Sequence, residues 1–213
     1  MNNTSDTLTV PPTTMPPTFR LYLVRAVVAL VWAGLLVVAL SSSGPLTPQE
    51  SVPAFAVALL IIYPLIDVVA SLIDARTQQR HGAPRNATTQ LANAAISSAA
   101  AIAIAVTASH GADAILRVFG TWASLTGLIQ LALGLLRRRG GTPGQWAMIL
   151  SGGISTVAGL SFTQLATKSD LNLTPLAGYA TLGAVFFLLS AWRLRSGPQA
   201  RVAGTVDLTV FPA

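Results

Sequence analysis

Six apolar segments, each about 20 to 24 residues long, follow one another along this chain of 213 residues. They cover residues 19–40, 53–75, 88–108, 113–136, 145–166 and 173–194. At about 1.5 Å per residue, a helix of this length crosses a hydrocarbon core of about 30 Å. Because lipid offers no hydrogen-bond partners, an open-ended segment in a bilayer must satisfy its own backbone as a helix. The sequence therefore predicts an all-α membrane protein with six transmembrane helices.

The composition supports the bilayer as the surrounding medium. Only 9% of the residues are charged, against about 25% in soluble domains. The mean hydropathy is +0.62. The net charge of +6 is explained by basic loops that orient membrane helices, so we expect the lipid bilayer, and not nucleic acid, as the partner. The chain has no Cys, which excludes disulfides, thiolate metal sites and cysteine nucleophiles.

The loops alternate in charge, which predicts the topology. Arginines follow the second, fourth and sixth segments: Arg76, Arg80 and Arg85, then Arg137, Arg138 and Arg139, then Arg193, Arg195 and Arg201. The intervening loops hold Lys168 and no other Lys or Arg. Basic loops stay in the cytoplasm. We therefore expect a multi-pass protein of the plasma or inner membrane with both termini on the cytoplasmic side.

The ends of the chain differ from its middle in composition. Residues 1–18 are polar and rich in Pro and Thr, which predicts a disordered cytoplasmic tail. The transmembrane domain is expected over residues 19–195, followed by a short cytoplasmic tail at 196–213. A cleaved signal peptide is the alternative for the start, because Arg20 and Arg25 precede an apolar run. The long polar lead argues against cleavage.

The even-numbered segments share a layout. Each contains a block that begins with an aromatic residue, Tyr63, Trp122 or Tyr179, and ends 13 to 16 residues later in Arg. This pattern predicts three helical hairpins, formed by segments 1–2, 3–4 and 5–6, as parallel repeats rather than inverted ones. The third segment is Ala-rich and only mildly apolar. We expect it to sit between other helices and not to face lipid.

Opposite charges fall inside the first hairpin. Asp67 lies about eight residues, or ~12 Å, from the cytoplasmic end of its helix, and Arg25 about six residues, or ~9 Å, from the same side. An unpaired charge in a membrane helix is costly, so we expect Arg25 and Asp67 to meet inside the bundle. The alternative for Arg25 is snorkelling to the headgroups. Asp74, beside Arg76 near the interface, is expected to make a surface or loop contact.

Other polar side chains lie at a similar depth: Ser71, Asn93, Gln130, Ser151 and Ser190. They form either a cavity or proton-responsive site with Asp67 as the titrating group, or a set of interhelical hydrogen bonds. Such bonds contribute about 1 kcal/mol each, and this structural reading is favoured. A cavity lined by Asp67, Asn93 and Gln130 would favour the first reading, and a dry packed layer the second.

Proline and small residues predict local features of the helices. Pro64 lacks an N–H, so it should kink its helix and free the carbonyl near Leu60. Small residues recur every four positions in two rows: Ser151, Ser155 and Gly159, and Ala95, Ala99 and Ala103. Such rows let helix backbones approach closely. We expect them to build the core of one chain, with a homo-oligomer face as the alternative.

Motifs for catalysis are missing from the sequence. No phosphate-binding GxxxxGK[ST], zinc-binding HExxH or nucleophile GxSxG occurs. The two His, His81 and His110, fall in loops on opposite sides. We therefore expect no enzyme, no cofactor and no metal site. The run Arg137 to Arg139 is expected either to touch anionic lipid or to act only as a topology signal.

Several blocks carry a family resemblance. They are RxxxxxxWAGLL from Arg25, YPxxDxxASLxDAR from Tyr63, GQWAMILSGGISTVAGLSF and LAGYATLGAVFFLLSAWRL. Over residues 19–195 they resemble the HdeD-type, short-repeat membrane protein family. The resemblance implies a polytopic membrane protein linked to acid or envelope stress, and it supplies no catalytic residues. We expect a non-enzymatic protein of this type, with a small transporter or proton-responsive channel using Asp67 as the alternative.

Overall fold

The computed structural model describes residues 17–80, 84–141 and 145–196. The helices are α1 (Pro17–Leu40), α2 (Ala54–Arg80), α3 (Pro84–Thr107), η1 (Ala108–His110), α4 (Ala112–Arg139), α5 (Trp146–Leu165) and α6 (Thr174–Ser196). Each of the six α-helices is long and apolar enough to cross a membrane. The prediction of an all-α membrane protein is therefore confirmed. Residues 1–16 and 197–213 of the two predicted tails lie outside the described residues.

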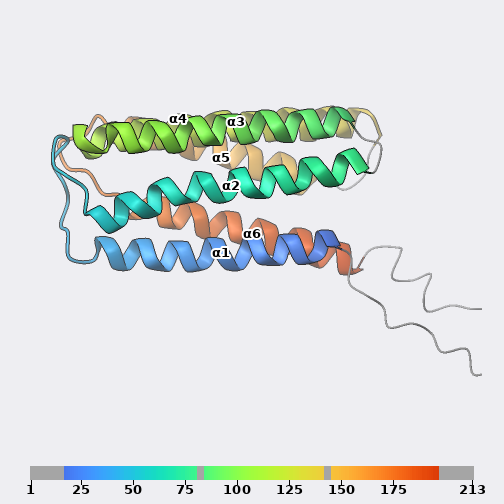
Figure 1. Cartoon of the computed structure of the whole chain (residues 1–213), viewed down its shortest axis with the longest axis horizontal. Coiled ribbons are helices and arrows are strands. Elements are labelled where there is room, and N and C mark those ends of the chain that lie inside the picture. The colour runs from blue at the N-terminus through green and yellow to red at the C-terminus, as the bar shows by residue number, and fades with distance from the viewer. Residues whose placement is uncertain (1–16, 81–83, 142–144, 197–213) are drawn as a thin grey trace, which may run out of the picture.

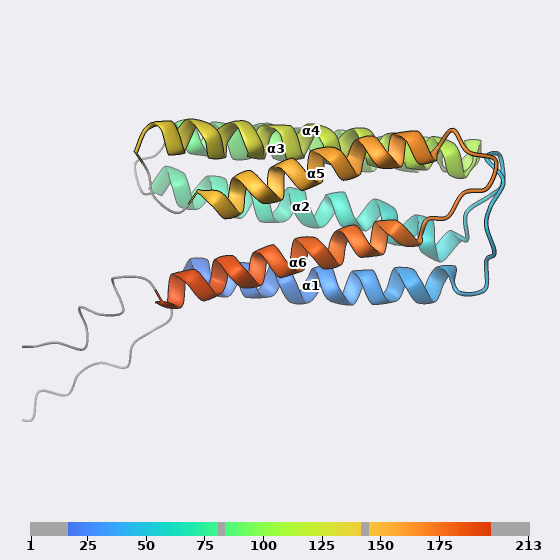
Figure 2. The same cartoon turned by 180° about the vertical axis from the view of Figure 1, so that it is seen from behind.

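The six helices form a ring in chain order. Each helix packs against the helices before and after it, and α6 packs against α1. In Figures 1 and 2, α1 and α6 form one side of the ring, α3 and α4 the other, and α2 and α5 lie between. The start of α1 and the ends of α2, α4 and α6 share one end of the bundle. We call this the basic end, because it carries Arg20, Arg76, Arg80 and Arg137 to Arg139.

The tightness of packing alternates around the ring. The closest pairs are α2 with α3, α4 with α5, and α1 with α6. The predicted hairpins, α1–α2, α3–α4 and α5–α6, are neighbours in the ring but pack more loosely. The repeat in the sequence marks the hairpins. It does not reveal the tight contacts, because these join the even helix of one hairpin to the odd helix of another.

Glycines allow the close contact between α4 and α5. A Cβ on Gly152 would lie 2.5 Å from the backbone nitrogen of Leu131, and one on Gly127 would lie 2.6 Å from that of Thr156. The buried Ser155 donates a 3.1 Å hydrogen bond to a backbone carbonyl of α4. Ser155 and Gly159, two members of the small-residue row of α5, are buried in the core of a single chain, as preferred from the sequence.

Helix α3 faces two environments. Its close packing on α2 is helped by small buried residues such as Ala101, while Ile102 and Val106 are 65% and 63% exposed. The expectation that α3 sits between other helices is therefore wrong. Its alanines reflect close approach on one side only. Ala95 and Ala99 are also exposed, so their row does not build the core.

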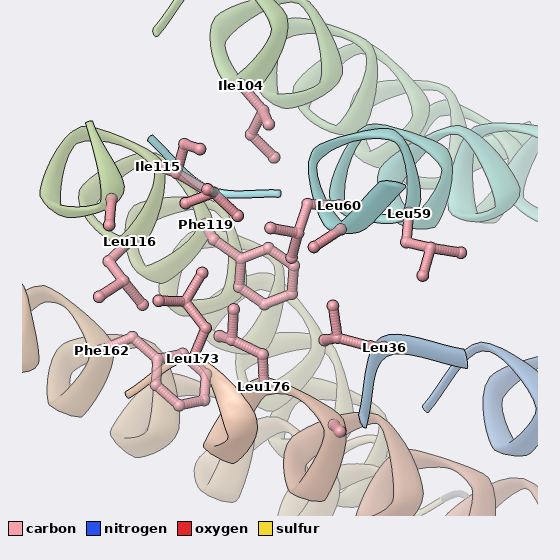
Figure 3. Packing of buried hydrophobic residues seen from close by; sticks show 14 of the residues in the cluster. Leu36, Leu59, Leu60, Ile104, Ile115, Leu116, Phe119, Phe162, Leu173 and Leu176 are labelled. Atoms are coloured by element: carbon pink, nitrogen blue, oxygen red, sulfur yellow. The ribbon is translucent and has the colours of Figure 1, made fainter. Parts of the chain in front are cut away.

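Apolar side chains fill the half of the ring away from the basic end. Every helix contributes to this cluster, as residues labelled in Figure 3 show: Leu36, Leu60, Ile104, Phe119, Phe162 and Leu176. Beyond it, the loop after α1 pairs with the loop after α5, through hydrogen bonds of 2.9 and 2.8 Å between Leu46 and Leu171. Both of these leucines are buried. The opposite end of the ring is therefore tightly closed.

Helix α2 continues through the buried Pro64. A proline removes one helical hydrogen bond. In the turn before it, the carbonyl of Leu59 accepts a 2.7 Å hydrogen bond from the indole N–H of Trp32 on α1. A donor from the neighbouring helix thus reaches the backbone close to the break. The kink itself stays a prediction.

Candidate functional site

A cavity of about 240 Å³ lies inside the ring, between its middle and the basic end, and all six helices contribute to its lining. Its place follows from the apolar cluster described above, which fills the other half of the ring. The cavity therefore faces the end of the bundle that carries the arginines.

Aromatic side chains form the inner end of this cavity. Tyr63, Trp122 and Tyr179 all line it. The rings of Tyr63 and Trp122 lie 5.8 Å apart, and both Trp122 and Tyr179 pack edge-on against Phe119. These are the aromatic positions that the even-numbered segments share in the sequence. The ring arrangement brings them together near its axis.

Serines on the preceding helices fix two of these aromatic rings. The indole N–H of Trp122 donates a 2.9 Å hydrogen bond to Ser97 of α3. The hydroxyl of Tyr179 shares a 2.6 Å hydrogen bond with Ser155 of α5. Polar contacts thus hold the inner end of the cavity in one geometry, which is a requirement for a binding site.

Equivalent positions on the even helices line the cavity further toward the basic end. Four and eight residues after each aromatic come Asp67 and Ser71 on α2, Thr126 and Gln130 on α4, and Gly183 and Phe187 on α6. Residues four apart share one face of a helix, so all of these positions point to the axis. Of these positions, only the one held by Asp67 carries a charge.

Arg25 and Asp67 meet inside the ring, as the sequence predicted. Nη2 of Arg25 donates a 2.9 Å hydrogen bond to Oδ1 of Asp67. Their side chains are 18% and 19% exposed, so Arg25 does not snorkel to the headgroups. The other oxygen, Oδ2, accepts hydrogen bonds from Asn93 at 2.7 Å and from Ser97 at 2.8 Å. Three donors thus stabilise one carboxylate in a membrane helix.

Ser97 is a site residue that the sequence analysis did not predict. It is fully buried and joins Trp122 to Asp67. It lies one turn after Asn93 on the same face of α3. This four-residue spacing from Asn93 is the feature of the sequence that could have identified Ser97. Asn93 also donates a 2.9 Å hydrogen bond to Ser71, so the α2–α3 contact holds a continuous polar network.

The contact that Asp74 makes differs from the one expected from the sequence. Its Oδ2 lies 3.5 Å from Nη1 of Arg25, and its side chain is 19% exposed. The expected surface or loop contact is therefore wrong. Asp67 and Asp74 are two helical turns apart on one face of α2, and the guanidinium reaches both. The same guanidinium lies over the ring of Phe187, 4.6 Å from its centroid.

The remaining candidates divide into two groups. Gln130 and Ser151 line the cavity, and the side chain of neither makes a hydrogen bond within the described ranges. Ser190 does not line it among the described residues. Its hydroxyl donates to the carbonyl of Phe186 in its own helix at 2.8 Å. The structure thus brings all of the predicted polar residues except Ser190 to one cavity.

The arginines at the end of α4 have different surroundings. Arg137 lines the cavity. Arg138 lies over the ring of Trp146, 3.8 Å from its centroid, which ties the end of α4 to the start of α5. Contact of Arg137 to Arg139 with anionic lipid stays a prediction.

The lining of the cavity shows which chemical groups it offers. Among residues 17–80, 84–141 and 145–196, no three of His, Asp and Glu are grouped to hold a metal ion. The lining offers carboxylates, amides, hydroxyls and aromatic faces instead. Comparisons with protein-family models, curated proteins and solved structures find no match.

Proposed function

We propose that this protein is a small membrane transporter or channel that admits a solute to the cavity between its helices. The observation that carries the proposal is the cavity of about 240 Å³ lined by Asp67, Asn93 and Gln130. A layer of polar residues that served only to hold helices together would be expected to pack without such a space.

The asymmetry of the ring supports a one-sided opening. The half away from the basic end is filled by the apolar cluster, and its loops are tied by the Leu46–Leu171 pair. A solute therefore enters from the basic end. By the distribution of arginines, we place this end and both termini in the cytoplasm, in the plasma or inner membrane.

A non-enzymatic stress protein of the HdeD type is the second candidate. One observation favours it: the carboxylate of Asp67 already has three hydrogen-bond donors, as a structural anchor would. In that case the polar cluster stabilises the ring, and the cavity has no ligand.

Cysteine labelling tests the proposed function, because the chain contains no Cys. Gln130→Cys places a thiol in the cavity. Leu36→Cys is the matched control, since Leu36 is fully buried in the apolar half. The cysteine thiolate is the nucleophile that attacks thiol reagents, and it forms readily only where water reaches the sulfur. We expect a membrane-impermeant reagent to modify Gln130→Cys much faster than Leu36→Cys, and only from the basic-end side of oriented vesicles.

The side of the membrane from which Gln130→Cys is labelled tests whether a solute can enter the cavity. Failure to modify Gln130→Cys from either side would mean a dry cavity and would refute solute entry. Modification of Gln130→Cys from both sides would indicate that the ring also opens at the other end, as alternating access in a transporter requires.

A further inference from the structure

The charges around Arg25 do not cancel. One guanidinium lies 2.9 Å from a carboxylate oxygen of Asp67 and 3.5 Å from one of Asp74. Two carboxylates therefore share one positive charge. Arg25, Asp67 and Asp74 together carry a formal excess of one negative charge, and a charge at membrane depth without a close partner calls for one. Arg137 is the other charged residue of the described lining.

The two carboxylates are not equally satisfied. Asp67 accepts hydrogen bonds from Arg25, Asn93 and Ser97. For Asp74, the contact with Arg25 at 3.5 Å is the one ionic contact within the described residues, and it is longer than a good hydrogen bond. Asp74 also lines the cavity. It is the carboxylate with acceptor capacity left for a ligand.

Arg137, the other basic residue among the described lining, lies nearer the mouth. The ends of α2 and α4 share the basic end of the bundle. Asp74 lies six residues before Arg80, the last residue of α2, and Arg137 lies two residues before Arg139, the last residue of α4. At 1.5 Å per residue, Arg137 lies about 6 Å closer to the basic end than Asp74. It therefore lies on the mouth side of Asp74, and Arg25 is the basic residue in contact with both carboxylates.

The walls of the cavity favour cations. The guanidinium of Arg25 already lies 4.6 Å from the centroid of Phe187, which is the geometry of a cation–π contact. Tyr22 stacks on the same ring. The inner end adds the rings of Tyr63, Trp122 and Tyr179. Near Asp74, the aromatic rings are those of Phe187, which the guanidinium of Arg25 also contacts, and Tyr22, which stacks on Phe187. A carboxylate beside aromatic rings is a combination that recognises organic ammonium groups.

From these observations we infer that the cavity binds a small aromatic or alkyl ammonium cation, with Asp74 as its counter-ion. The inference rests on the proposed function and names the class of solute. The ammonium group lies against Asp74 beside Phe187, and the apolar part of the solute extends toward Tyr63 and Tyr179. Arg25 stays bound to Asp67.

Calorimetric titration of the full chain in a non-ionic detergent tests this inference. The probes are phenyltrimethylammonium, the uncharged acetanilide and the anionic benzenesulfonate. We expect only the cation to bind, and Asp74→Asn to weaken it by about tenfold or more, as for the loss of a close charge partner. Asp74→Glu keeps the charge and should retain most of the affinity. Asp170→Asn, in an exposed loop at the other end, is the matched control and should have no effect.

These results test the class of solute and leave the proposed transport function to a separate experiment. Binding of acetanilide or benzenesulfonate as tight as that of the cation would overturn the inference. The cavity would then still bind a solute, but without a preference for cations. An unchanged affinity in Asp74→Asn would also overturn the inference. Absence of binding by all three probes would overturn it too. The cysteine labelling of Gln130→Cys does not depend on these probes, so it tests the proposed function separately.

Discussion

Arg25 and Asp67 stand 42 positions apart in the sequence and are joined by a 2.9 Å hydrogen bond inside the ring. This bond spans the contact between α1 and α2, one of the loosely packed pairs. On the cavity side, α1 is thus tied to α2 through charged groups, whereas at the other end apolar packing joins the same helices. The pair therefore holds the cavity half of the ring together.

Removing either member of this pair should destabilise the protein strongly. Arg25→Ala leaves Asp67 and Asp74 without their shared cation, and Asp67→Asn leaves Arg25 with the distant Asp74 alone. Because a charge that loses its partner in a low-dielectric site is costly, we expect a loss of about 2 to 4 kcal/mol in the free energy of unfolding for each. The measurement is a denaturant titration in detergent micelles.

The double variant and a surface pair complete this experiment. Arg25→Ala with Asp67→Asn should cost less than the sum of the two single changes, because the second change removes a group that is already unpaired. The exposed pair of Arg117 and Asp113, 3.3 Å apart, should contribute less than about 1 kcal/mol. Strict additivity for Arg25 and Asp67 would contradict the coupling.

Ser97 should matter much more than the serine beside it. Ser97→Ala removes a donor to Asp67 and an acceptor for the indole of Trp122. We expect a loss of about 1 to 3 kcal/mol, because both partners are left incompletely hydrogen-bonded. Ser98 donates only to the carbonyl of Ala94 in its own helix. Ser98→Ala should therefore change the free energy of unfolding by no more than about 0.5 kcal/mol, and equal effects would argue against the network.

Asp74 should contribute little to stability, in contrast to Asp67. Asp74→Asn leaves the 2.9 Å bond between Arg25 and Asp67 in place and removes only a 3.5 Å contact. We expect a change of less than about 1 kcal/mol, measured by the same titration. A loss as large as that of Asp67→Asn would show that Asp74 is a structural partner of Arg25 and is not kept for a ligand.

The sequence predicts how deep a residue lies in the bundle better than it predicts which residues that residue contacts. Counting residues from the helix ends brought Arg25 and Asp67 to one level, because the rise of a helix is nearly constant. The same count brought Asn93, Gln130 and Ser151 to the cavity. Depth does not give direction, however. Ser190 has a similar depth but donates to its own helix, and the face that a helix presents depends on its neighbours.

Which helices pack most closely was harder to predict from the sequence than the depth of a residue. The repeat of Tyr63, Trp122 and Tyr179 predicted the hairpins, but the closest contacts lie between them. Glycines decide this, because Gly127 and Gly152 allow backbone contact only where both helices present them together. Glycines occur in many membrane helices for other reasons. Their pairing across two helices is therefore visible only in three dimensions.

Two adjacent glycines of α5 give the sharpest test of this packing. Because a Cβ on Gly152 would lie 2.5 Å from the backbone nitrogen of Leu131, Gly152→Ala must push α4 and α5 apart. We expect a loss of about 1 to 3 kcal/mol, as for other overpacked cores. A Cβ on Gly153 would meet nothing within 4 Å.

Gly153→Ala should thus be neutral or stabilise the protein by up to about 1 kcal/mol, since alanine is the better helix former. Both variants are compared by denaturant titration and by the labelling of Gln130→Cys, which lies on the face of α4 that lines the cavity. A separation of α4 and α5 in Gly152→Ala should speed this labelling. Equal stability of Gly152→Ala and Gly153→Ala would mean that the two helices do not touch through their backbones.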